Sequence, residues 1–191
     1  MASAIHSDGA EVTLNAGDLV YWGDVLSTTG NARIGLTLID DTKLSFGEDG
    51  RMVLDELTYD AKTHEGRLSL SVVDGVVSFL SGLISKSGPE AMQVRTPVAT
   101  IGVHGTKVAI KAGAEGEENV ITLLEEGGGI AGEIVVTNQG GSQILNQAGQ
   151  ATSVWSFVGA PSAPTILPPS QVDLLFSPTV AVMLQRGAKN R

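Results

Sequence analysis

The fold is decided by the stretch Thr96-Pro-Val-Ala-Thr-Ile-Gly-Val-His-Gly-Thr-Lys-Val-Ala-Ile-Lys111. Its aliphatic and β-branched side chains are of the kind that favours strands over helices. Gly102 and Gly105 interrupt them, and glycine adopts backbone angles that bulkier residues avoid. The stretch therefore predicts two short strands, residues 99–103 and 107–111, joined by a glycine-containing bend, and it carries no catalytic signature.

Period-two alternation extends outward from this stretch in both directions. Between residues 32 and 39, Ile34, Leu36 and Leu38 share one face; a turn at Asp40-Asp41-Thr42 and a strand at 43–46 follow. Further strands are predicted at residues 11–14, 19–22, 51–54, 67–73, 76–84, 92–96, 120–124, 133–137, 142–145 and 151–157. Turn signals about every 8–12 residues predict an all-β fold, either a β-sandwich or a short β-solenoid.

Two features within this pattern affect how the strands connect. Asp74-Gly75 separates two apolar runs and predicts a hairpin turn. The run from Phe79 to Ile84 lacks strict alternation, so a short helix is the alternative to a strand there.

The order of three segments resembles the FecR family. The opening pattern is Asn15-Ala-Gly-Asp-Leu-Val-Tyr-Trp-Gly-Asp-Val-Leu-Ser-Thr-Thr-Gly30, and the hairpin pattern is Ala32-Arg-Ile-Gly-Leu-Thr-Leu-Ile-Asp-Asp-Thr-Lys-Leu-Ser-Phe46. The stretch 96–111 is similar to the closing half. The resemblance covers roughly residues 15–155, with Asp40-Asp41-Thr42 where the family usually has Asp-Gly. The family-motif residues, expected to be structural, are Gly17, Asp18, Thr96, Pro97, Gly102, Gly105 and Thr106.

The resemblance implies a bacterial, envelope-associated all-β domain that binds a protein. Some family members sense iron uptake and control a sigma factor through a helical N-terminal region and a membrane span. Neither feature is seen in this chain, so iron signalling is not carried over, and a structural or protein-interaction module is the expected role.

The composition changes at Gly159. Residues 1–158 are predicted to be the FecR-like domain, and residues 159–191 a proline-rich linker and an apolar tail. A short helix is expected at 170–176, with Ser170 as its N-cap and Pro178 ending it. The tail is expected to dock on the domain or on another copy; Val180, Val182 and Leu184 are the candidate assembly residues.

Charge and cysteine content exclude several functions. The 191 residues carry a formal net charge of −9, which argues against binding to nucleic acid or to an anionic membrane. There is no cysteine, so disulfides, thiolate nucleophiles and cysteine–zinc sites are excluded. The N-terminal residues show no secretory signal, and no apolar run is long enough to insert into a membrane. A periplasmic, cell-surface or secreted location is expected from the resemblance.

The residues with chemical potential form no recognised catalytic or cofactor pattern. His104 has no triad partners nearby in sequence, and Gly102–Lys107 lacks the spacing of a phosphate loop. The acidic residues around Asp40 and Glu56 are expected to be solvated turns, with calcium binding left open. Trp22, Trp155 and Phe157 are expected to anchor the core.

The sequence therefore predicts a non-catalytic protein-interaction module that needs no cofactor, takes no small-molecule substrate, and binds a protein partner or itself. The alternative is a glycan-binding or glycan-active protein that uses exposed aromatics and a carboxylate pair such as Asp40 with Glu56.

Overall fold

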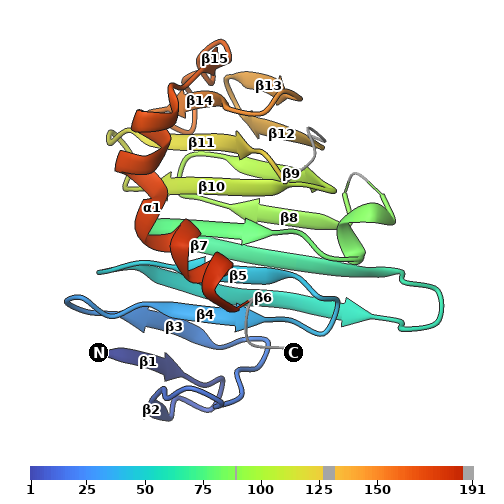
Figure 1. The fold of residues 1–191 in the computed structure, drawn as a ribbon, viewed down its shortest axis with the longest axis vertical. Coiled ribbons are helices and arrows are strands. Elements are labelled where there is room, and N and C mark those ends of the chain that lie inside the picture. Colours follow the sequence, from blue (N-terminus) through green and yellow to red (C-terminus); the bar gives the residue numbers. More distant parts are fainter. Residues whose placement is uncertain (89, 127–131, 187–191) are drawn as a thin grey trace.

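The computed structural model describes residues 1–88, 90–126 and 132–186. Its strands form one continuous sheet, and its long helix is α1 (Pro169–Arg186) (Figure 1). The strands are β1 (Ala2–Ile5), β2 (Glu11–Thr13), β3 (Val25–Thr28), β4 (Ile34–Thr37), β5 (Lys43–Phe46), β6 (Arg51–Tyr59), β7 (Gly66–Leu80), β8 (Met92–Arg95), β9 (Thr100–His104), β10 (Lys107–Ala112), β11 (Asn119–Leu124), β12 (Glu133–Asn138), β13 (Gly141–Leu145), β14 (Gln150–Val154) and β15 (Thr165–Ile166). The all-β prediction is confirmed.

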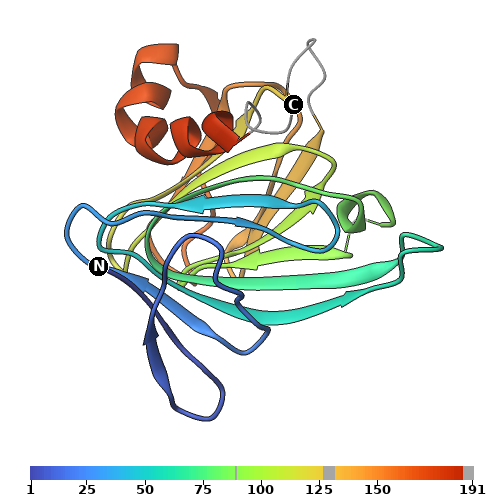
Figure 2. The ribbon, with the colours of Figure 1, turned by 60° about the horizontal axis from the view of Figure 1, so that its bottom comes forward.

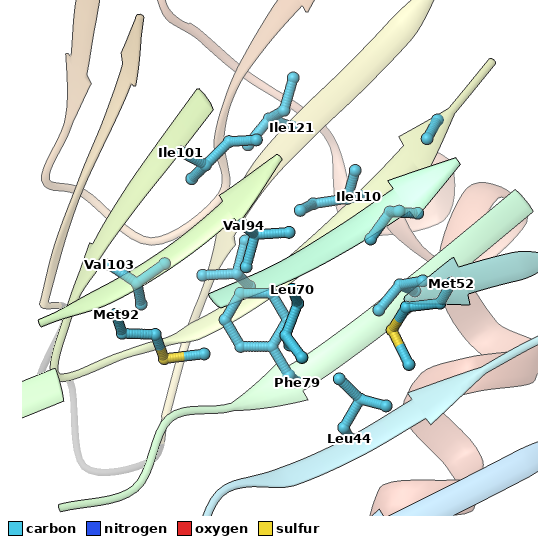
Figure 3. Close-up of a cluster of buried hydrophobic side chains, with 14 of the residues drawn as sticks. Leu44, Met52, Leu70, Phe79, Met92, Val94, Ile101, Val103, Ile110 and Ile121 are labelled. Carbon is cyan, nitrogen blue, oxygen red and sulfur yellow. The ribbon is translucent and has the colours of Figure 1, made fainter. Parts of the chain in front are cut away.

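The sheet folds over on itself into two layers. The first layer has the strand order β2-β1-β3-β6-β7-β8-β9-β12-β13, and the second has the order β4-β5-β7-β10-β11-β14-β15. Neighbouring strands are antiparallel except β7 and β8, which are parallel. Both layers contribute to one apolar core, in which Leu70, Val94 and Ile101 from the first layer face Phe79, Ile110 and Ile121 from the second (Figure 3).

Strand β7 belongs to both layers, which makes the predicted hairpin at Asp74-Gly75 wrong. Its first half pairs with β6 and β8, and its second half pairs with β5 and β10. Leu68, Leu70 and Val72 point into the core before the corner, whereas Val77 and Phe79 do so after it. Because alternation has a period of two, this change from even to odd positions requires one extra residue at the bend.

Several boundaries differ from those predicted. Residues 19–22 form an irregular segment instead of a strand, and β1 and β3 were not predicted. The alternative helix at 79–84 is also wrong, because Phe79 and Leu80 end β7 and the 3-10 turn covers Ile84–Lys86.

Helix α1 lies against the outer face of the second layer (Figure 2). Val172, Leu175, Phe176 and Val180 pack there on side chains of the sheet, and the Thr179 hydroxyl lies 2.6 Å from the Ser78 hydroxyl. The predicted stop at Pro178 is wrong. A proline removes the hydrogen bond to the carbonyl four residues earlier, here that of Leu174, but the helix continues past it to Arg186.

The surface beneath α1 is a row of small side chains. The strand registers place Ser45, Ser78, Ala109, Thr122 and Ala151 side by side across five strands. All of them are buried. Small side chains let the helix approach the sheet closely, so the tail docks on its own domain, with Val180 half-buried in this contact. Val182 and Leu184 lie in α1, but their side chains are outside the described part of the structure.

Candidate functional site

An open slot lies between the two layers at the β4 end of the sheet. It has a volume of about 460 Å³ and is lined by residues 14–20, by residues 33–39 and by Ala2 and Leu57. The partly buried side chains of Leu14, Val20 and Leu57 pack against the main core. The slot thus has an apolar floor continuous with the protein interior, and we call it the β4 slot.

The segment that forms one wall of the β4 slot is held at both ends. At its start, Gly17 has φ +100°, and the Asp18 carboxylate accepts a hydrogen bond of 2.7 Å from the Asn15 amide. At its end, the buried Asp24 carboxylate accepts a hydrogen bond of 2.8 Å from the Tyr21 amide and lies 2.8 Å from His6 Nδ1. Two family-motif residues, Gly17 and Asp18, therefore shape this wall.

Large apolar side chains are exposed around the β4 slot. Leu19 is 72% exposed, Trp22 70% and Ile39 66%. Tyr21 and Trp22 line a second, smaller hollow against Leu54 and Glu56 of β6. The prediction that Trp22 anchors the core is wrong, because aliphatic side chains fill the interior and leave this ring on the surface. Large exposed apolar patches are typical of surfaces that contact other molecules, so these side chains are the candidates for such a contact.

The other wall of the slot is an open strand edge. In the described part of the chain, β4 pairs with β5 and has no strand on its other side. The Leu38 amide donates a hydrogen bond of 2.9 Å to the Thr42 carbonyl. Leu36 and Ile34 lie two and four residues earlier, so they form the other hydrogen-bonded pairs with β5. Because hydrogen-bonded and non-hydrogen-bonded pairs alternate, Gly35 and Thr37 point their N–H and C=O groups away from β5, toward the slot.

Carboxylates gather at the Ile39 end of the slot. Partial burial, and then the negative charges of Asp41, Asp40 and Asp60, raise the pKa of Tyr59. The Tyr59 hydroxyl lies 2.9 Å from His64 Nδ1. Asp41 and Asp60 are exposed, so this end of the slot presents a negative surface.

Asp40 and Glu56 do not form the carboxylate pair that the glycan alternative requires. Asp40 is fully buried, and its carboxylate accepts hydrogen bonds of 3.1 Å from the Thr42 amide, 2.8 Å from the Thr42 hydroxyl and 3.3 Å from the Ile84 amide. Glu56 is exposed on β6. Asp40 therefore fixes the β4–β5 turn to the segment after β7.

We expect Asp40→Asn to lower the free energy of unfolding by about 1–2 kcal/mol, because an amide supplies one acceptor oxygen where the carboxylate supplies two. Urea unfolding followed by circular dichroism measures this effect. Asp41→Asn is the matched control: its side chain is exposed and asparagine tolerates its positive φ of 67°, so its stability should not change measurably.

The remaining family-motif residues lie at turns and strand contacts and do not line the β4 slot. Thr96 closes the turn around Pro97, with its amide 2.8 Å from the Ala99 carbonyl and its hydroxyl accepting from the Ala99 amide at 3.1 Å. Gly102 pairs with β8 and β12. Gly105 has φ +55°, and the buried Thr106 donates its amide to the Ser81 hydroxyl at 2.8 Å.

The exposed aromatics do not form one platform. Trp155 is 55% exposed and Phe157 42%, so their predicted burial is also wrong. Both follow β14, whereas Trp22 precedes β3, and these strands lie at opposite ends of the stack (Figure 1). Within the described residues there is no group of three acidic or histidine side chains arranged to hold a metal ion.

The chain belongs to the FecR family, because the family profile described as FecR protein matches residues 24–127. Comparison with curated proteins gives no match. Two crystal structures of a candidate anti-sigma factor from Parabacteroides distasonis, at 1.65 and 2.50 Å resolution, are similar, each with a TM-score of 0.56 and 17% sequence identity. The match covers 78% of this chain and 62% of the anti-sigma factor, and at this identity it shows the fold alone.

The FecR match begins at Asp24 and ends before β12. It therefore includes β4 and the sheet face beneath α1 except for Ala151 of β14, but neither α1 itself nor the wall of the slot formed by residues 14–20. Among the helices of the described part, none has the length and apolarity needed to cross a membrane.

Proposed function

We propose that this chain is a non-catalytic protein-binding module of the FecR type, and that it contacts its partner through the β4 slot. The observation that carries this proposal is the group of exposed apolar side chains, Leu19, Trp22 and Ile39, around a slot of about 460 Å³. Aromatic side chains are enriched at protein interfaces and dominate their energies.

The partner we propose is a bacterial regulatory or envelope protein. The likeness of the fold to a candidate anti-sigma factor and the membership in the FecR family support a role in regulation. A periplasmic, cell-surface or secreted location is part of the proposal, and fractionation of the native bacterium tests it. The net charge of −9 favours a protein partner over an anionic lipid surface.

Photo-crosslinking in the native bacterium tests the surface. With p-benzoylphenylalanine in place of Trp22, we expect a discrete crosslinked product that contains a second protein. The same group in place of Ile144 is the control, because Ile144 is 52% exposed on β13, at the far end of the first layer. No product at position 22, or equal products at both positions, would contradict the proposal.

Self-assembly through the tail is a second candidate function. Leu174 is 82% exposed on α1 and lines a hollow of about 330 Å³ with residues of β11, β14 and β15. A second copy could bury this side chain. Light scattering across a concentration series should then show a mass that rises with concentration for the chain as it stands, but not for Leu174→Lys. A constant monomer mass for both would contradict self-assembly.

A further inference from the structure

We propose that the β4 slot binds its partner by strand addition: an extended segment with alternating apolar residues pairs with the free edge of β4 and places a basic residue at the Ile39 end. This inference rests on the proposed function and adds the conformation and chemistry of the segment that binds.

The backbone of β4 is arranged for such pairing. Gly35 and Thr37 present N–H and C=O groups on the side away from β5, and both line the slot. A strand edge with unpaired groups of this kind is a template for another strand. The four residues of β4 span about 13 Å, which sets the length of the paired segment at about four residues.

The floor of the slot determines the side-chain pattern of the segment. Leu36 of β4 and Leu38 just after it, together with Leu14, Val20 and Leu57, are partly buried apolar groups that pack against the core. An added strand continues the sheet, so every second side chain points to this floor and the intervening ones point to solvent. Apolar residues at alternate positions would extend the core outward.

Charge determines which end of the segment is basic. Exposed Asp41 and Asp60 lie at the Ile39 end, and Asp18 lines the slot. At the other end, the Arg33 guanidinium lies 3.1 Å from the Glu48 carboxylate. A lysine or arginine near Ile39 is therefore attracted, whereas an acidic residue there is repelled.

Selection from a random dodecapeptide library displayed on phage tests the inference on the whole chain. We expect enriched peptides in which apolar residues alternate and a lysine or arginine lies at one end. No enrichment, a consensus with helical spacing, or an acidic consensus would overturn the inference.

Two variants then test the geometry with an enriched peptide made synthetically. Thr37→Pro removes an outward N–H and leaves the β4–β5 hydrogen bonds in place, because a proline is tolerated at an edge position whose N–H faces solvent. The affinity of the Thr37→Pro variant for the peptide should fall by about fivefold or more. Thr37→Val keeps the N–H and the β-branched shape, so its affinity should stay within about twofold. Equal affinities for the two variants would overturn strand addition.

A third variant tests the charge. Asp41→Asn should weaken binding about threefold to fivefold at low ionic strength, and the difference should shrink as salt is added. An unchanged affinity would contradict the placement of a basic residue of the bound segment at the Ile39 end of the slot. Crosslinking at position 22 that succeeds while the library selection fails would leave the protein-binding module standing and reject strand addition alone, so the two failures are distinguishable.

Discussion

Gly75→Ala is expected to lower the free energy of unfolding by about 3–5 kcal/mol. Gly75 lies at the corner where β7 passes from one layer to the other, with φ +100°. A Cβ there would lie 2.7 Å from Gly50 Cα, closer than such atoms approach. Gly50 cannot move aside easily, because its amide and its carbonyl are both hydrogen-bonded to Thr28, each at 2.9 Å.

Gly116→Ala is the matched control for backbone strain. Gly116 has a similar φ of +93°, but a Cβ there would meet no atom within 4 Å. Its substitution should cost about 1 kcal/mol, the penalty for the positive φ alone. Urea unfolding followed by far-ultraviolet circular dichroism is the suitable measurement, because both tryptophans are largely exposed and report poorly on unfolding. If both variants lost the same free energy of unfolding, a steric clash between the added Cβ and Gly50 would be contradicted.

The corner at Gly75 shows why the sequence predicted the strands better than their connections. An Asp-Gly pair between two apolar runs is typical of a hairpin, and this local signal is the same whether the chain reverses or only bends. The distinguishing signal was present: the core positions shift from Leu68, Leu70 and Val72 to Val77 and Phe79. That shift from even to odd positions indicates an extra residue within one strand.

The β4 slot was not predicted, although its residues were. Leu19 to Trp22 are apolar and were expected to form a strand, but the Asp24 carboxylate holds the Tyr21 amide in an irregular turn. The alternation of Ile34, Leu36 and Leu38 correctly predicted β4. That β4 lies at an edge depends on the strand order, a long-range property that alternation within one segment does not contain.

The docking of α1 depends on a face of the sheet that looked polar in sequence. Ser45, Ser78 and Thr122 alternate with core residues and so read as solvent-facing positions. They are small and uncharged, however, and the structure buries them beneath the helix. A solvated strand face usually carries charged side chains, whereas this face carries small polar ones. That difference was the available signal that another element covers the face.

Phe176→Ala is expected to lower the free energy of unfolding by about 3–5 kcal/mol. Phe176 is fully buried and packs with Ala109, Val120 and Ala151 on the outer face of the second layer. Removing the ring leaves a cavity in the helix–sheet contact. The remaining contacts are the Ser78–Thr179 hydrogen bond and the partly buried side chains of Val172, Leu175 and Val180, and none of these replaces the fully buried ring. Loss of the helical signal at 222 nm and a lower urea midpoint are the expected readouts.

Leu174→Ala separates this packing from helix propensity. Leu174 lies two positions earlier in α1 but is 82% exposed, and alanine is as good a helix former as leucine. Its unfolding free energy should stay within about 0.5 kcal/mol of that of the parent chain. If Phe176→Ala lost the helical signal at an unchanged urea midpoint, α1 would be a detachable cover that adds nothing to the stability of the sheet. A lower midpoint for Phe176→Ala alone would instead establish that the sheet is completed by a helix outside its FecR-matched residues.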